Sequence, residues 1–210
     1  MTNENVEFFK KHGYCIIRSA ISAELRDFVT QYALFDEMQD YTPDGKQVPT
    51  AHAKYADPAM ESMLMILHKQ IEENTGLSVF PTYSFYRVYR DGDKLDHHRD
   101  RESCEISTTL CFNYSYDDSK YSWPIFMNGV EANLKPGDMV IYRGCELDHW
   151  REEFKSPEGD SWHVQGFFHY VDANGPFKDF KFDRRPSVGL LRKNSVRSSK
   201  PYIQYTNNLL

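Results

Sequence analysis

The sequence predicts a mainly β protein, a sandwich or jelly roll of antiparallel strands with helices packed on one side. The 210-residue chain is 40% hydrophobic and 15% aromatic, which is enough to bury the core of a single domain. From Val79 onward, β-branched and aromatic residues recur in short runs separated by Gly, Pro, Asn and Asp, the pattern of short strands and turns. The clear helical patterns precede Val79, so helices and strands do not alternate as they would in a parallel α/β fold.

The N-terminal part predicts one short strand and one helix. Tyr14–Ile17 is apolar and partly β-branched, as a strand requires. Ser22 is a favourable N-cap. The apolar residues after it have the spacing of an amphipathic helix, and they are Leu25, Phe28, Val29 and Tyr32.

A loop and a second helix follow. Residues 41–58 are polar and punctuated by proline and glycine, which predicts a loop that covers a site. The helix has Asp57 as its N-cap, Pro58 at its first position and Gly76 just beyond its end. We expect its apolar face in the core, and that face consists of Met60, Met63, Leu64, Leu67 and Ile71.

Seven further strands are predicted after Val79. Asn128-Gly129 is the strongest hairpin signal in the chain. The strands are Tyr83–Arg90, Leu95–Arg101, Glu105–Tyr114, Trp123–Met127, Val130–Leu134, Met139–Arg143 and His163–Val171. We expect a single domain in which residues 1–78 give helical support, residues 79–172 form the core, and residues 173–210 form a basic extension.

The charge distribution limits the possible partners. The net charge is −6, which disfavours binding of nucleic acid. The extension carries +6 and the rest of the chain −12; it either folds back on the acidic body or contacts a partner, a subunit or an anionic substrate. There is no apolar run long enough for a membrane span and no secretory signal, so we expect a cytoplasmic protein without a membrane partner. The oligomeric state stays open.

One group of residues predicts metal chemistry. Residues i and i+2 of a strand share a face, so His98 and Asp100 can bind one ion while His97 and Arg99 point away. His149 is the candidate third ligand. Two histidines and one carboxylate leave neighbouring coordination positions open, as in non-heme Fe(II) oxygenases. Taken alone, H-x-D is a weak signal.

The surrounding residues strengthen this interpretation. Residues 89–100, YRDGDKLDHHRD, resemble the motif around the first two metal ligands in Fe(II)/2-oxoglutarate-dependent dioxygenases of the prolyl-4-hydroxylase-like type. Residues 135–142, KPGDMVIY, resemble the turn and strand that lead to the distal histidine. Trp162 to Asp172 resembles the final barrel strand. The resemblance covers about residues 79 to 172.

The resemblance implies a double-stranded β-helix that holds Fe(II) through His98, Asp100 and His149. It further implies 2-oxoglutarate as co-substrate, O2 as oxidant, succinate and CO2 as co-products, and ascorbate as an expected stimulant. The predicted reaction is hydroxylation of a small molecule, an amino acid or a peptidyl residue. Aromatic residues that could line a pocket are Tyr83, Phe85, Tyr121, Trp123 and Trp150, and His169 is a further candidate.

One position departs from the family pattern. The family places Arg or Lys at the start of the last strand to bind the distal carboxylate of 2-oxoglutarate, where this chain has His163. We predict that Arg151, which shares a strand face with His149, takes over this role. We expect hydrogen bonds from His163, Tyr89 and Gln165. The alternative is a surface arginine paired with a neighbouring glutamate, Glu152 or Glu153, and the fallback cations are Arg87 and Arg143.

Two other classes of function keep the same barrel. A cupin-like enzyme would use Zn(II) or another divalent ion for hydrolysis or isomerisation. A binding or sensor protein would keep the barrel without catalysis. Added 2-oxoglutarate distinguishes the oxygenase from both alternatives, because neither alternative converts it to succinate.

Overall fold

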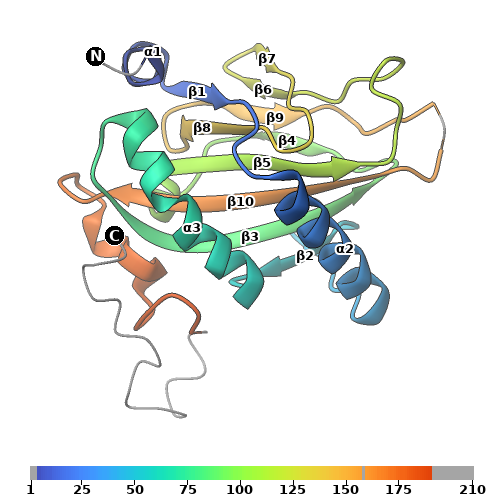
Figure 1. Cartoon of the computed structure of the whole chain (residues 1–210), viewed down its shortest axis with the longest axis horizontal. Helices are drawn as coiled ribbons and strands as arrows, with labels where there is room; N and C mark the ends of the chain where they lie inside the picture. Colours follow the sequence, from blue (N-terminus) through green and yellow to red (C-terminus); the bar gives the residue numbers. More distant parts are fainter. Residues whose placement is uncertain (1–3, 158, 191–210) are drawn as a thin grey trace.

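The computed structural model describes residues 4–157 and 159–190. The chain forms a mainly antiparallel β fold with three α-helices in its N-terminal third (Figure 1). In chain order, the elements are α1 Glu4–His12, β1 Tyr14–Ile17, α2 Ala23–Gln39, β2 His52–Tyr55, α3 Pro58–Thr75, β3 Val79–Arg90, β4 Leu95–His98, η1 Glu102–Cys104, β5 Ile106–Tyr114, β6 Ile125–Met127, β7 Val130–Ala132, β8 Met139–Arg143, β9 His149–Arg151, β10 Trp162–Asp172 and η2 Lys178–Arg184.

The strands form two antiparallel sheets, as a jelly roll requires. The larger sheet has the order β1-β8-β5-β10-β3-β2, and the smaller has the order β4-β9-β6-β7. The smaller sheet contains the hairpin predicted from Asn128-Gly129, whose residues both have the positive φ of a tight β-turn. A cavity between the sheets is lined by residues of both, so the core strands enclose a site as well as a hydrophobic interior.

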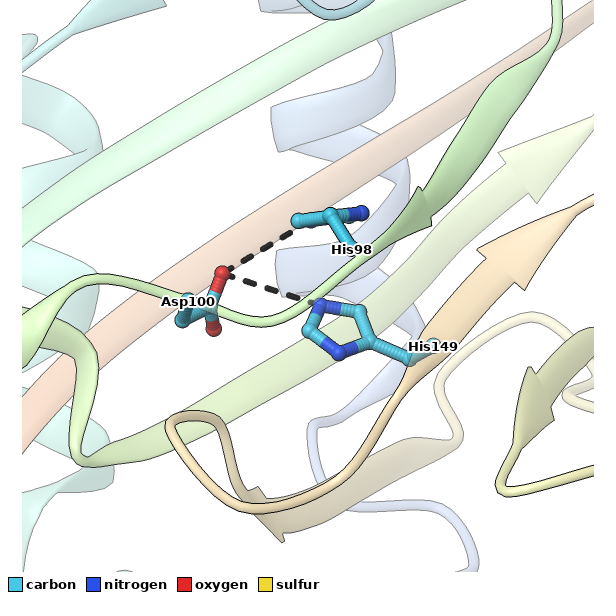
Figure 2. A group of neighbouring side chains, drawn as sticks. All are labelled: His98, Asp100 and His149. Atoms are coloured by element: carbon cyan, nitrogen blue, oxygen red, sulfur yellow. Dashed lines mark ion pairs between the residues drawn. The ribbon is translucent and has the colours of Figure 1, made fainter.

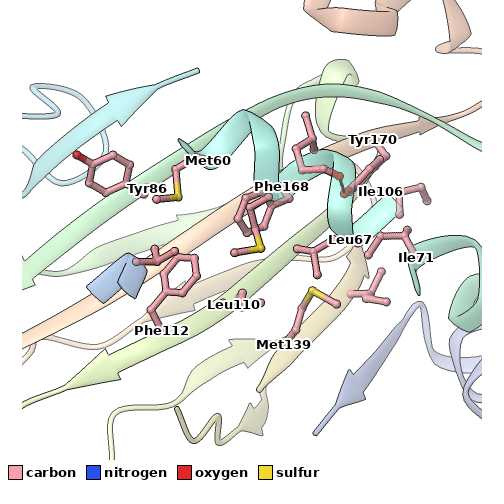
Figure 3. Close-up of a cluster of buried hydrophobic side chains, with 14 of the residues drawn as sticks. Met60, Leu67, Ile71, Tyr86, Ile106, Leu110, Phe112, Met139, Phe168 and Tyr170 are labelled. Carbon is pink, nitrogen blue, oxygen red and sulfur yellow. Dashed lines mark hydrogen bonds between the residues drawn. The ribbon is translucent and has the colours of Figure 1, made fainter. Parts of the chain in front are cut away.

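The second predicted helix is confirmed as α3. The Asp57 side chain accepts hydrogen bonds from the first backbone N–H groups, and Gly76 ends the helix with a left-handed φ of 71°. Figures 1 and 3 show α3 lying across the larger sheet, with its apolar side chains packed against it. The expected core face is buried, and it packs with Ile106, Leu110, Phe112, Met139, Phe168 and Tyr170. In α2, Val29 is buried, but Phe28, one of the apolar residues at amphipathic spacing, is 62% exposed.

Three local predictions differ from the structure. Helix α1 has no counterpart in the predicted elements. The segment predicted as loop contains β2, whose short HAKY sequence lacks strand alternation and which pairs with β3 at the edge of the larger sheet. The predicted strand from Leu95 ends at His98, because the backbone then leaves the sheet and the Asp100 N–H donates to the Gly144 carbonyl at 2.9 Å.

The described part of the basic extension packs on the domain. Asp183 and Arg185 are buried, and η2 lies against β3. Four of the predicted extension cations, Arg192, Lys193, Arg197 and Lys200, lie outside the described residues. Among the helices that the structure describes, none is both long and apolar enough to cross a membrane.

Candidate metal centre and cavity

The three predicted metal ligands come together at one point. His98 ends β4, Asp100 lies in the loop after it, and His149 begins β9, which pairs with β4. The Asp100 Oδ1 atom lies 3.7 Å from His98 Nε2 and 3.6 Å from His149 Nε2. Figure 2 shows the carboxylate facing both imidazole rings. The candidate ligand atoms all lie within 4.8 Å of one another, the arrangement needed to hold one ion.

Hydrogen bonds on the far side of each ligand orient the donor atoms. His98 Nδ1 lies 2.8 Å from the Asp96 carbonyl, and His149 Nδ1 lies 3.0 Å from the Leu147 carbonyl. Because a carbonyl only accepts, each Nδ1 donates a hydrogen, and in the neutral ring this leaves the Nε2 lone pair for a metal. Ser107 Oγ donates to Asp100 Oδ2 at 2.7 Å, which leaves Oδ1 available.

The local charges suit metal binding. Burial and the nearby His149 lower the pKa of His98, so this ring is neutral at pH 7. Burial raises the pKa of Asp100, but hydrogen bonding to His149 and its charge outweigh this and bring the pKa to about 2. Burial lowers the pKa of His149, but hydrogen bonding to Asp100 and its charge outweigh this and raise the pKa. Asp100 is therefore an anion beside two imidazoles, the donor set expected for a divalent transition metal.

A glycine allows the chain to pass close to this group. A Cβ atom at Gly144 would clash with Asp100, with Ser107 and with the Cys104 carbonyl. Gly144 follows β8 and accepts the Asp100 backbone hydrogen bond described above. The sequence does not predict this role of Gly144, because the role depends on the close approach of two loops that are far apart in the chain.

The two neighbours of His98 behave differently from each other. His97 points outward as expected: its ring stacks on Trp150 at 3.7 Å between centroids, and its Nδ1 lies 3.1 Å from Asp148. The prediction that Arg99 points away is wrong, because Arg99 lines the cavity. Strand alternation does not apply to it, since β4 ends one residue earlier.

The metal ligands open into a cavity of about 430 Å³ between the two sheets. Tyr83 and Phe85 line it, as expected. Trp123 and Tyr121 do not line it but pack in a hydrophobic cluster behind its wall, and Trp150 lies on the outer face. The complete lining consists of Asp44, Lys46, Gln47, Tyr55, Tyr83, Phe85, Arg87, Leu95, His98, Arg99, Asp100, Arg101, Cys104, Ile125, Tyr142, His149, Phe167 and His169.

His169 lines this cavity and contacts Ser107, the residue that donates a hydrogen bond to Asp100. Its Nδ1 lies 2.9 Å from Ser107 Oγ, on the strand register that pairs His169 with Ser107. Burial lowers the pKa of His169 to about 4, so the ring is neutral at pH 7. Ser107 gave no sequence signal, because only the pairing of β5 with β10 brings it beside Asp100.

Arg151 is buried, not on the surface. It is 1% exposed, so the alternative of a surface pair with Glu152 or Glu153 is wrong. Its Nη1 donates to the Trp123 carbonyl at 2.5 Å and its Nη2 to Gln165 Oε1 at 3.1 Å, whereas Nε has no partner. No carboxylate of the described chain forms an ion pair with Arg151, and burial lowers its pKa. A buried cation in this state is suited to an anionic ligand.

The other predicted co-substrate residues surround Arg151. His163 Nε2 donates to Gln165 Oε1 at 2.7 Å, and its Nδ1 lies 3.1 Å from the Tyr116 hydroxyl. Burial and the Arg151 charge hold the pKa of His163 well below its usual range. Tyr89 is fully buried and accepts a hydrogen bond from Arg87 Nη1 at 3.2 Å. The four residues therefore form one polar region inside the barrel.

Arg87, one fallback cation, differs from Arg151 in both position and pairing. It lines the cavity, whereas Arg151 lies outside the lining set. Its Nη2 binds Asp44 at 2.8 Å and Gln47 at 2.6 Å, so its charge is already balanced. Leu95, which lines the cavity, lies directly opposite Arg151 in the β4–β9 register, and opposite residues of an antiparallel pair project to the same side.

Arg143, the other fallback cation, is paired with Glu146 and does not line the cavity.

Comparisons with known proteins extend the fold assignment. No protein-family model matches the sequence, and no curated protein matches it. Solved structures match well: prolyl-4-hydroxylase from Pseudomonas putida has a TM-score of 0.64 at 17% identity over 80% of this chain and 98% of that chain. EctD from S. alaskensis, solved with 2-oxoglutarate and 5-hydroxyectoine, has a TM-score of 0.64 at 14% identity over 91% and 86%.

A third match comes from nogalamycin biosynthesis. The non-heme alpha ketoglutarate dependent epimerase SnoN has a TM-score of 0.66 at 10% identity, over 89% of this chain and 90% of that chain. The three proteins share an architecture with this chain at low sequence identity. The chain therefore has the double-stranded β-helix fold found in the 2-oxoglutarate-dependent oxygenases.

Proposed function

We propose that the protein is an Fe(II)- and 2-oxoglutarate-dependent oxygenase that hydroxylates a small molecule, an amino acid or a peptidyl residue. The observation that carries the proposal is the set of three oriented donors, His98 Nε2, Asp100 Oδ1 and His149 Nε2, at the wall of a cavity between the sheets. Two histidines and one carboxylate on one side of an ion leave positions for a co-substrate and O2. The fold found by the comparisons supports this class.

The group supplied from solution is Fe(II), which when bound would activate O2 as 2-oxoglutarate is converted to succinate and CO2. The chain's own residues bind and orient. Ser107 holds Asp100 so that one oxygen faces the ion, and the Nδ1 hydrogen bonds fix both histidine rings. The apolar side chains of the cavity wall, Phe85, Leu95, Ile125 and Phe167, limit the contact of the reacting groups with water, which strengthens the electrostatic interactions there.

We propose that Arg151 binds the distal carboxylate of 2-oxoglutarate. Arg151 is buried without a carboxylate among the described residues, and its Nε is free to donate. Gln165 and His163 lie in the same hydrogen-bonded group, and Tyr89 lies directly opposite His163 in the β3–β10 register. Arg87 is the rival because it lines the cavity, but Asp44 already balances its charge.

The class of reaction is tested by product detection. The purified protein is incubated with Fe(II), ascorbate and 2-oxoglutarate, and succinate is measured by NMR, first alone and then with a panel of metabolites and peptides. We expect succinate in the parent and none above background in Asp100→Ala. His97→Ala is the matched control, because this histidine faces the outer surface, and it should keep the parent rate.

Metal binding separates the proposal from its two alternatives. If Zn(II) supports hydrolysis or isomerisation while 2-oxoglutarate is never consumed, the protein is a cupin-like enzyme of another class. If the ion binds but no substrate of either class turns over, the barrel is a binding or sensor protein. Equal Fe(II) affinity in the parent and in His149→Ala would show that the assigned ligands are wrong.

A further inference from the structure

The cavity has a positive lining in an acidic protein. Lys46, Arg87, Arg99 and Arg101 line it, against two acidic residues, Asp44 and Asp100. The whole chain has a net charge of −6. A cleft whose charge is opposite to that of the molecule concentrates ligands of the complementary sign.

The partners of these cations show which of them are available. Arg87 is paired with Asp44, and Arg101 is paired with Asp183 at 2.8 Å. Asp100 belongs to the metal centre. Arg99 and Lys46 are exposed, and neither has a hydrogen bond or an ion pair with any residue in 4–157 or 159–190. Two of the four cations in the lining are therefore free to bind a ligand.

Arg99 and Lys46 belong to two different segments of the cavity lining. Arg99 lies in the chain between two proposed metal ligands, His98 and Asp100. Lys46 belongs to the loop between α2 and β2, and the Asp44–Arg87 ion pair ties this loop to β3. An anionic group held by both cations would lie next to the metal centre and next to this loop.

The walls of the cavity are aromatic. Tyr55 and Tyr83 lie 4.9 Å apart between ring centroids, and Tyr83 lies 4.5 Å from His169. This run of rings ends at the histidine that contacts Ser107 beside the metal centre. Phe85 and Phe167 form a second pair of rings at 6.2 Å, and the Arg87 guanidinium lies over one face of each. Walls of this kind favour a flat apolar group.

We propose that the prime substrate is a small anion with a flat apolar part. Arg99 and Lys46 bind its carboxylate or phosphate group, and the aromatic run holds the apolar part against the metal centre. The cavity volume of about 430 Å³ lies in the range of small-molecule sites. This assignment rests on the proposed oxygenase function, because it assumes that 2-oxoglutarate occupies the Arg151 region and leaves Arg99 and Lys46 for the substrate.

The test compares matched probes on the full chain. Benzoate and phenyl phosphate carry the two candidate anions, and benzamide is the neutral equivalent of benzoate. Affinity is measured by calorimetry without oxygen, with Mn(II) and saturating 2-oxoglutarate, and relaxation of the probe protons by Mn(II) reports their distance from the metal. Because a charge-assisted contact is typically worth about 1.5 to 3 kcal/mol, we expect one anion to bind about ten- to a hundredfold more tightly than benzamide.

Variants assign the preference to residues. Arg99→Gln and Lys46→Gln should each reduce the preference about tenfold or more, while Lys69→Gln, which removes the same charge from the exposed face of α3, should leave it unchanged. Benzamide affinity equal to that of both anions in the parent would overturn the proposal. So would an anion preference that disappears when 2-oxoglutarate is added, because the anions would then occupy the co-substrate site.

A second measurement separates this inference from the proposed function. The affinities are repeated on the protein without Mn(II) and 2-oxoglutarate. If 2-oxoglutarate fails to bind, the oxygenase proposal fails, but a preference for anions that depends on Arg99 and Lys46 would still support an anion site. If 2-oxoglutarate turns over and that preference is absent, only the substrate assignment fails.

Discussion

Two buried arginines of this molecule differ in whether a neighbouring carboxylate balances their charge. Arg185, on the back of the larger sheet, has a fully buried side chain and lies 2.9 Å from the equally buried Glu61. Arg151, inside the barrel, is also buried, but it donates to a carbonyl and an amide oxygen, lies over the Trp123 ring at 4.4 Å and leaves Nε without a hydrogen-bond partner. A buried charge is costly unless it is paired. The comparison teaches that the charge of Arg185 is balanced within the fold, whereas no carboxylate of the described residues balances the charge of Arg151.

The Arg185 group is saturated with hydrogen bonds. The guanidinium also donates to the Thr82 carbonyl at 2.9 Å and to the Phe182 carbonyl at 2.9 Å. Glu61 accepts from the backbone N–H groups of Ser84 and Gly189. This group joins α3, β3 and the segment after η2, so the described part of the basic extension acts in packing.

The largest expected effect is on stability at this paired site. Arg185→Met leaves Glu61 buried without its cation, so we expect a loss of about 3 to 5 kcal/mol of unfolding free energy. Urea denaturation of the parent and the variant measures it. The double variant Arg185→Met with Glu61→Gln should recover part of the loss, because no charge is then left unpaired. A single variant as stable as the parent would contradict the structural role of the pair.

The second effect separates stability from ligand binding at Arg151. Arg151→Met removes an unbalanced buried cation, so we expect stability within about 1 kcal/mol of the parent. The same change should lower the affinity for 2-oxoglutarate by about ten- to a hundredfold, the value of a charge-assisted contact. The affinity for Mn(II) should not change. Calorimetric titrations of both ligands check this. A large loss of stability with unchanged 2-oxoglutarate affinity would show that Arg151 is structural, like Arg185.

Arg87 provides an intermediate case, because it is buried in the cavity wall and paired with Asp44. Arg87→Gln should release the loop that carries Asp44 and change 2-oxoglutarate affinity by less than about threefold, since the balanced cation is not the expected anchor. Hydrogen exchange of residues 44–48 and the same titration measure both effects. If Arg87→Gln weakens the binding of 2-oxoglutarate more than Arg151→Met does, then Arg87, not Arg151, binds the distal carboxylate.

The sequence predicts the metal ligands better than it predicts Ser107 and Gly144, the residues that position them. His98 and Asp100 are adjacent in a short motif, and the turn before β8 leads to His149, so local spacing and order identify the ligands. Ser107 and Gly144 have no such signal, because their effect depends on a strand pair and on two loops meeting. The Arg99 prediction was wrong for a related reason: strand alternation says nothing about a residue beyond the strand end.

The fold shows the same division between local and long-range information. Caps and apolar spacing identify α3 with its bounds, and β8 is predicted with the bounds that the structure has. Strand β2 depends on pairing with the edge of β3, not on its own sequence. The carboxylate of Glu61 gives no sign in the sequence that a residue far along the chain, Arg185, will balance it.

The smallest expected effect is a pH dependence that reports the Arg151 charge through His163. Burial and the Arg151 charge keep His163 neutral in the fold, with a pKa well below its usual range. In the unfolded chain a histidine binds a proton below about pH 6.5. His163 therefore destabilises the fold as pH falls below that point, by about 1.4 kcal/mol per pH unit while the folded ring stays neutral.

Replacing Arg151 removes one of the two causes of this shift. In Arg151→Met the His163 pKa should rise toward its usual range, so stability should fall less steeply between pH 6.5 and pH 5 than in the parent. Bound 2-oxoglutarate should raise the same pKa in the parent by balancing the Arg151 charge. NMR titration of the His163 ring, with His97→Ala as a control variant, measures the shift. An unchanged His163 pKa in Arg151→Met would mean that burial alone keeps the ring neutral, and that the charge on Arg151 is already balanced within the protein.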